Sequence, residues 1–136
     1  MNIASLIPED IRRELILFAC DLVRIKSYSG REEEIIRFIE QKMISLGYDR
    51  VIVDAMGNLT GIIGDGPVSV MFDSHVDTVE VNDEDEWDIQ PFSGEIVDGR
   101  LHGRGSVDMK SSVAASVYAG AIAKKSGLTA GRTIYV

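Results

Sequence analysis

The sequence predicts an α/β fold in which helices cover a mixed sheet. Three observations predict it: apolar residues recur at helical spacing early in the chain, short strand-like segments bounded by turns follow, and an alanine-rich helical run precedes a last strand-like segment. Helices and strands therefore alternate, which is the pattern of a sheet covered by helices. The chain has 136 residues, 45% of them hydrophobic, so one folded domain is expected.

The first helix is predicted to begin at Pro8, because proline followed by Glu9 and Asp10 makes a favourable first turn. Residues 28–30, Tyr-Ser-Gly, are expected to end it. Its apolar stripe contains Ile11, Leu15, Phe18, Leu22 and Ile25. The single cysteine, Cys20, excludes an internal disulfide and is expected to be a buried apolar residue of this helix.

A second helix is predicted to follow at once. Ser29 and Glu32 have the spacing of a capping box, in which the serine hydroxyl accepts a hydrogen bond from the first turn. Gly47 is expected to end this helix. Its apolar positions are Ile35, Ile39, Met43 and Leu46.

Strands are predicted next, at about residues 50–54, 59–63 and 68–72, and the last of these is expected to be buried. Residues 95–102 have the pattern of a hairpin with Asp98-Gly99 at its turn. A further helix is expected from Met109 to about Lys125, and a final strand at 133–136.

The first chemically informative stretch is Ser-His-Val-Asp-Thr-Val at residues 74–79. His75 falls at the carboxyl end of a predicted strand, which is where open α/β sheets bind ligands. An extended backbone would point His75 and Asp77 to the same side. One could then bind a metal ion while the other holds the imidazole or tunes a bound water. Taken alone, the pair is better explained as a strand end followed by a turn.

The second stretch is Gly-Arg-Gly-Ser-Val-Asp-Met-Lys at residues 103–110. Asp108 is expected at the start of a helix, where the helix dipole favours a carboxylate, and taken alone it is better explained as a plain N-cap. A phosphate cradle is weakly supported, since no Gly-Lys-Ser/Thr follows and the carboxylate would repel phosphate. Together, the two stretches supply an imidazole and two carboxylates, the donors of a hydrolytic metal site.

Three neighbouring residues are expected to have no direct role. His102 is interpreted as structural, and Lys110 is expected to face solvent or the helix start. Ser74 is a poor nucleophile candidate, because adjacent strand residues point to opposite faces and no Gly-x-Ser-x-Gly turn is present.

The two stretches occur in order, with Trp87-x-x-x-Pro-Phe-Ser-Gly between them. In this arrangement the chain resembles the di-zinc metallopeptidase family that includes acetylornithine deacetylase, succinyl-diaminopimelate desuccinylase and aminoacylase. The resemblance covers about residues 68–123, with a weaker fit of the helical residues 8–46. One departure is that Ser111 and Ser112 stand where the family usually has two glycines.

The resemblance implies that His75 binds one metal ion and that Asp108 bridges two. It implies that Asp77 is the acid that orients the histidine, and that the Asp108–Met109 peptide bond is cis. It also implies that residues 1–136 form the N-terminal portion of a zinc-peptidase-like catalytic domain, with an incomplete three-layer sheet. The remaining ligands, a general base and a lid domain are then expected outside this chain.

The function that follows from the resemblance is metal-dependent cleavage of an amide bond in a small N-acyl amino acid or peptide. Two divalent metal ions are expected, with zinc favoured and cobalt or manganese as alternatives. The 136-residue chain itself is expected to be inactive. The alternative is a non-catalytic fragment or degenerate homologue that only folds and self-associates.

Charge and composition restrict the partners. The formal net charge of −8 argues against nucleic-acid binding, which requires basic patches. No long apolar span and no signal-peptide pattern occurs, so neither a membrane location nor export is expected, and the cytoplasm is the predicted location. The strand at 133–136 is expected to leave an unpaired apolar edge, which predicts a homo-oligomer.

Overall fold

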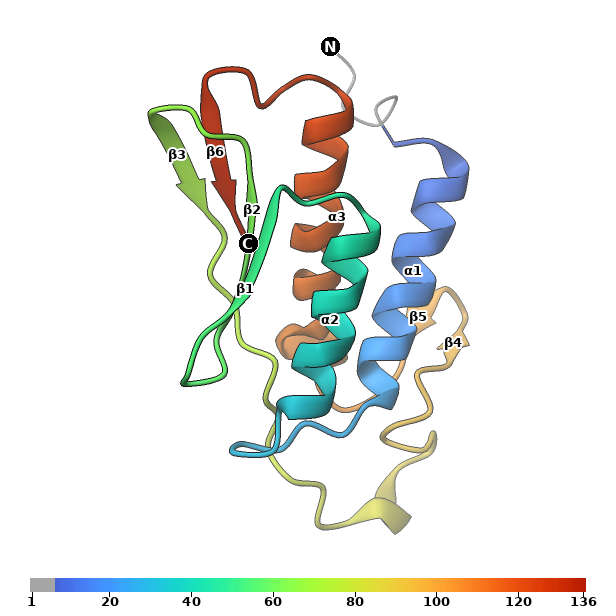
Figure 1. Cartoon of the computed structure of the whole chain (residues 1–136). Helices are drawn as coiled ribbons and strands as arrows, with labels where there is room; N and C mark the ends of the chain where they lie inside the picture. Colours follow the sequence, from blue (N-terminus) through green and yellow to red (C-terminus); the bar gives the residue numbers. More distant parts are fainter. Residues whose placement is uncertain (1–6) are drawn as a thin grey trace.

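The computed structural model describes residues 7–136, in which two helices, five strands, a third helix and a last strand follow in the order that the sequence predicts (Figure 1). The α-helices are α1 (Glu9–Arg24), α2 (Glu33–Ser45) and α3 (Ser111–Lys125). The strands are β1 (Arg50–Val53), β2 (Leu59–Ile63), β3 (Val68–Met71), β4 (Ile96–Val97), β5 (Arg100–Leu101) and β6 (Arg132–Tyr135). A short helical turn covers Glu84–Glu86, and a kinked turn with non-helical Asp108 and Met109 covers Ser106–Lys110.

The main sheet has the strand order β1-β2-β6-β3. β1 and β2 form an antiparallel hairpin, β2 pairs antiparallel with β6, and β6 pairs parallel with β3. Because β3 and β6 run in the same direction, the chain leaves both strands at the same edge of the sheet. The residues that follow β3 therefore start from a well-defined point beside the carboxyl end of β6.

Two expectations about this sheet are wrong. β6 is a central strand with buried Thr133 and Ile134, so it does not form the open edge. β3 is an edge strand, and all four of its residues are exposed rather than buried. An apolar run shows that a strand has apolar side chains, but whether another element covers them depends on strand order.

The helices lie on one side of the sheet, where α2 packs against β1 and β2 and α3 against β2 (Figure 1). α1 packs against α3. Phe18 of α1 fills the middle of this assembly, with its ring centroid 5.6 Å from Phe38 and 5.9 Å from Tyr118. The buried apolar core also includes Leu22, Ile35, Ile39, Met43, Ile63, Val113, Val117 and Ile134.

The start of α1 and the ends of α2 and α3 are confirmed, whereas α1 ends earlier than predicted, at Arg24, and α3 begins later, at Ser111. Pro8 precedes α1, and Gly47 has a φ of +82° just beyond α2. The capping box at Ser29 is wrong, because α2 has Glu32 at its N-cap and no side-chain cap bond. The Ser29 hydroxyl instead bonds to a residue far along the chain.

The β4–β5 hairpin turns at Asp98 and Gly99, as predicted, and both have the positive φ that a tight hairpin turn requires. Cys20 is buried, also as predicted. Among residues 7–136, no helix combines the length and the apolar character needed to cross a membrane.

Candidate metal centre

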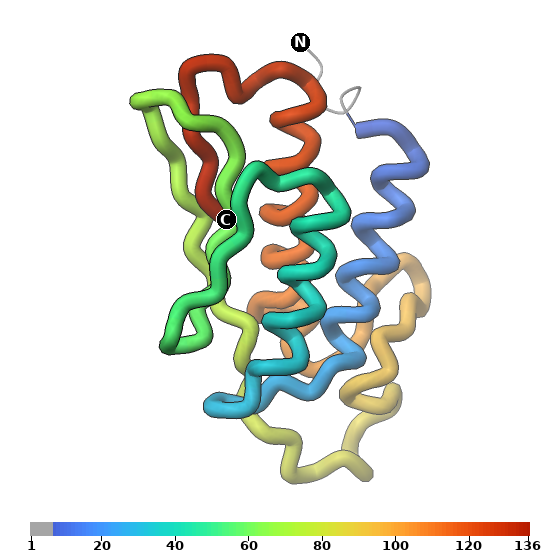
Figure 2. The backbone as a smooth tube through the Cα atoms, in the orientation of Figure 1, coloured from blue at the N-terminus to red at the C-terminus, as the bar shows by residue number. Residues whose placement is uncertain are grey.

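The segment after β3 carries His75 and Asp77 and is held by the connection between α1 and α2. The Thr78 N–H donates to Ser27 O at 2.8 Å, and the Ser27 hydroxyl donates to Val76 O at 2.6 Å. Tyr28 and Thr78 also form a parallel bridge. Figure 2 shows this connection, in light blue, close to the yellow-green chain after β3. Residues 76–78 thus have a fixed backbone although they lie outside the sheet.

Asp108 comes from the other stretch, in the turn that precedes α3. Gly103 and Gly105 have φ values of 139° and 80°, and a Cβ on Gly105 would come within 2.7 Å of the Thr78 side chain. Asp108 itself has an extended conformation, with φ −124° and ψ 93°, and the Asp108–Met109 peptide bond is cis, as expected. α3 begins at Ser111 without a side-chain cap, so Asp108 is not the N-cap of that helix.

These elements bring His75 and Asp108 together. His75 Nε2 lies 2.9 Å from Asp108 Oδ1. Both side chains are accessible, with 48% of His75 and 84% of Asp108 exposed, so an ion from solvent can reach them. The expected juxtaposition is confirmed, while the role of the two residues as metal ligands stays a prediction.

Asp77 faces the opposite nitrogen of the same ring. His75 Nδ1 lies 3.1 Å from Asp77 O and 3.2 Å from Asp77 Oδ1. The other carboxylate oxygen, Asp77 Oδ2, accepts a hydrogen bond of 2.6 Å from the Ser29 hydroxyl. The result is a continuous polar chain from Ser29 through Asp77 and His75 to Asp108.

A known protein family matches the part of the chain that carries this arrangement. Residues 71–136 match the family described as Peptidase family M20/M25/M40. Residues 71–136 of this chain are therefore similar to that peptidase family. The matched range includes His75, Asp77 and Asp108, so the carboxylate and imidazole groups of the candidate site lie within it.

Relatives with curated descriptions support the same assignment. Over 128 residues the chain is 38% identical to "Uncharacterized protein YgeY" of Escherichia coli K12, covering 94% of this chain and 32% of the relative. It is 33% identical over 124 residues to a succinyl-diaminopimelate desuccinylase of Rhodospirillum centenum, covering 85% and 32% of the two chains. The chain therefore spans about a third of the length of these relatives.

Solved structures show the same fold. Human carnosine dipeptidase 1 superposes with a TM-score of 0.76 at 22% identity, covering 91% of this chain and 31% of that one. The di-peptidase Dug1p of Saccharomyces cerevisiae gives a TM-score of 0.80 at 15% identity, covering 98% and 33%. The mixed α/β fold with a partial sheet is thus the fold of the corresponding part of these M20-type structures.

The electrostatics of the candidate site follow from its hydrogen bonds. The hydrogen bond to the Asp108 carboxylate is the largest effect and raises the pKa of His75. Desolvation lowers this pKa by less, and contacts with Asp77 raise it further. The bond from the Ser29 hydroxyl lowers the pKa of Asp77, and the neighbouring His75 lowers it further. Asp77 is thus kept ionised, and an ionised carboxylate can accept a hydrogen bond from a protonated ring nitrogen of His75.

Lys110 departs from expectation. Its side chain is fully buried, and its ammonium group donates to Ile25 O at 2.6 Å, just beyond the end of α1. Burial lowers the pKa of Lys110 to about 8. A lysine two residues after Asp108 therefore ties the site-bearing turn to α1, a contact that the local sequence does not reveal.

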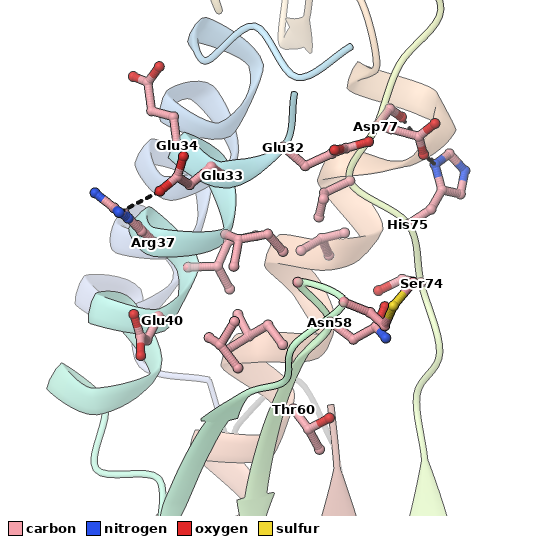
Figure 3. A pocket seen from close by; sticks show the side chains of 18 of the residues that line it. Glu32, Glu33, Glu34, Arg37, Glu40, Asn58, Thr60, Ser74, His75 and Asp77 are labelled. Atoms are coloured by element: carbon pink, nitrogen blue, oxygen red, sulfur yellow. Dashed lines mark hydrogen bonds and ion pairs between the residues drawn. The ribbon is translucent and has the colours of Figure 1, made fainter. Parts of the chain in front are cut away.

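A cavity of about 1190 Å³ opens beside the site, between α2, the β1–β2 hairpin and residues 73–77. Figure 3 shows His75 and Asp77 on one wall, opposite Glu33, Arg37 and Glu40 of α2. Ile39, Met43, Val113 and Val117 form part of its lining. His102 is not part of this cavity.

The donors fit a divalent metal in kind but not in number. A neutral imidazole nitrogen and a carboxylate oxygen 2.9 Å apart are suitable ligands for zinc, and Asp77 occupies the place of an orienting carboxylate. Among residues 7–136, however, no group of three or more histidine, cysteine or acidic side chains converges on one point. His75 and Asp108 could therefore contribute only part of a metal's coordination.

Proposed function

We propose that this chain contributes metal ligands to a hydrolase that cleaves an amide bond of a small N-acyl amino acid or peptide. His75 and Asp108 are the proposed ligands, and Asp77 is the proposed residue that orients His75. The observation that carries the proposal is the 2.9 Å approach of His75 Nε2 to Asp108 Oδ1, with Asp77 at the other ring nitrogen.

Asp77, His75 and Asp108 have different proposed roles. Asp77 would hold the Nδ1–H of His75, which would leave Nε2 to coordinate a metal ion and would raise its basicity. Asp108 supplies a negative charge beside Nε2, and its open exposure leaves a second oxygen available. When bound, a divalent cation lowers the pKa of a water molecule and polarises the scissile carbonyl.

Support for the substrate class comes from the relatives, one of which is a succinyl-diaminopimelate desuccinylase and another a carnosine dipeptidase. Both names describe cleavage next to an amino acid, and the family is a peptidase family. Two ions, with zinc favoured over cobalt or manganese, a deacetylase-type reaction and a cytoplasmic location remain part of the proposal.

The test is metal binding by the metal-free chain, measured by equilibrium dialysis against zinc and cobalt. We expect His75→Ala and Asp108→Ala each to reduce the bound metal, because each removes one of two nearby donors. His102→Ala is the matched control, since this second histidine lies outside the site, and it should bind as the wild type does. Equal binding by all four proteins would overturn the proposal.

The alternative, a module that only folds and self-associates, has one observation in its favour. Val68, Val70 and Met71 of the edge strand β3 are apolar and between 47% and 65% exposed. Such an edge favours pairing with another chain. Self-association of the chain, together with metal binding that does not change in His75→Ala, would support this alternative.

A further inference from the structure

We infer that Ser29 is a positioning residue of the site, because its hydroxyl holds the Asp77 carboxylate in the orientation that faces His75. Ser29 Oγ donates to Asp77 Oδ2 at 2.6 Å, while Asp77 Oδ1 lies 3.2 Å from His75 Nδ1. The two oxygens of one carboxylate thus have two different partners, and rotation of the carboxylate would break both contacts. The consequence for metal binding rests on the proposed function, whereas the positioning itself does not.

The backbone around Ser29 is fixed independently of this bond. Thr78 N–H donates to Ser27 O, the Ser27 hydroxyl donates to Val76 O, and Tyr28 bridges Thr78. Ser27 is fully buried and Thr78 is 6% exposed, so this contact belongs to the interior. Ser29 is therefore carried on a segment that is already attached to the chain bearing Asp77.

The side chain of Ser29 has no packing role that would explain the residue instead. It lies at an exposed position, so removing its hydroxyl opens no buried cavity. It does not cap α2, whose N-cap is Glu32, and Glu32 Oε1 is itself engaged by the Gly30 N–H. Among residues 7–136, the bond to Asp77 is the side-chain hydrogen bond that the Ser29 hydroxyl makes.

The effect of losing the hydroxyl follows from the remaining contacts. Without Ser29 Oγ, Asp77 Oδ2 loses its donor and the carboxylate can turn. His75 Nδ1 would still have the Asp77 carbonyl oxygen at 3.1 Å, but it would lose a fixed carboxylate partner. Ser29→Ala should therefore loosen the ring without unfolding the chain, and Ser29→Thr should preserve the bond because it retains the hydroxyl.

The test uses the metal-free protein with ¹³C- and ¹⁵N-labelled aspartate and histidine. We expect Ser29→Ala to shift the carboxyl carbon resonance of Asp77 and the ring nitrogen resonances of His75. Ser29→Thr should return both towards the wild-type positions. Ser45→Ala is the matched control, because the Ser45 hydroxyl bonds only locally, to Lys42 O at the end of α2, and it should leave both resonances unchanged.

A purely structural role would lower the thermal stability of Ser29→Ala and leave both sets of resonances at their wild-type positions, and this result would overturn the inference. So would a Ser29→Thr variant as strongly shifted as Ser29→Ala. In metal-binding measurements we expect Ser29→Ala to weaken affinity by less than the roughly tenfold minimum typical of losing a direct partner of a ligand. If the wild type binds no metal, the resonances still decide the positioning role, so the two proposals fail separately.

Discussion

His75 Nε2 and Asp108 Oδ1 lie 2.9 Å apart although 33 positions separate the two residues in the chain. His75 is placed by the segment after β3, and Asp108 by the turn before α3. The tight fit of Gly105 against Thr78 brings these two segments together. The candidate site therefore depends on packing between loops, not on a local sequence motif alone.

Asp77→Asn should weaken metal binding by roughly ten- to a hundredfold, the usual effect of losing the group that orients a ligating histidine. Asparagine has a similar shape but no negative charge to fix the Nδ1–H of His75. Titration of the metal-free chain with zinc measures the change, and Asp98→Asn, in the distant β4–β5 turn, is a control. Wild-type affinity in Asp77→Asn would exclude the orienting role.

The zinc-loaded 136-residue chain should not hydrolyse N-acetyl amino acids at an enzyme-like rate. His75 and Asp108 supply two donors, whereas each zinc ion takes about four ligands, and the described residues offer no third. Assays of amine release from a panel of N-acetyl amino acids test this expectation. Sustained turnover that is lost in His75→Ala would show that the chain is active after all.

The secondary structure was largely predictable because it depends on local patterns. The apolar positions Ile35, Ile39 and Met43 of α2 are buried as their spacing indicates, and the β4–β5 turn occurs at Asp98-Gly99. Strand order was not predictable in this way. The burial of β6 and the exposure of β3 depend on which strands pair, and pairing connects residues far apart in the chain.

The same division applies to the site. His75, Asp77 and Asp108 could be selected from their residue types, their positions and the family resemblance. Ser29 and Lys110 could not, because their partners, Asp77 and Ile25, lie 48 and 85 positions away. Ser29 also had a plausible local role as a helix cap, and that local interpretation concealed its contact with the site.

The stability of the metal-free chain should depend on the protonation of His75. The raised pKa means that the folded state binds the proton more tightly than the unfolded state. This contribution is fully present below the unfolded pKa of about 6.5 and is lost as the pH rises through the higher folded value. Urea unfolding of the wild type and His75→Gln across this range should show their difference shrinking as the pH rises. A constant difference would contradict the expected ion pair with Asp108.

Lys110 should have the opposite effect at alkaline pH. Its pKa falls from the usual 10.5 to about 8 in the folded state. Between these values the unfolded state binds more protons, so the stability contributed by this residue rises with pH. Lys110→Met has a similar volume and should remove this rise, whereas Lys125→Met at the exposed end of α3 should retain it. Unfolding measurements at several pH values between the two pKa values provide the comparison. If the free energy of unfolding of Lys110→Met rose with pH as steeply as that of the wild type, the lowered pKa of Lys110 would be contradicted.

The last prediction concerns self-association through β3, the apolar edge strand. β6 pairs with one side of β3, and no other strand among residues 7–136 pairs with the other. Its residues Val68 and Val70 are 63% and 47% exposed, which leaves apolar side chains and free backbone groups available to a second chain. Sedimentation over a concentration series should therefore show dimers or larger species.

A lysine on an edge strand opposes pairing with another chain, because its charge would have to be desolvated. Val70→Lys should accordingly shift the sedimenting species towards the monomer. Val79→Lys is the matched control, since Val79 is 69% exposed but lies outside the strands, and it should associate as the wild type does. A wild type that stays monomeric at every concentration would show that this edge does not recruit another chain. Equal dissociation by both lysine variants would mean that net charge, and not the edge of β3, controls the association.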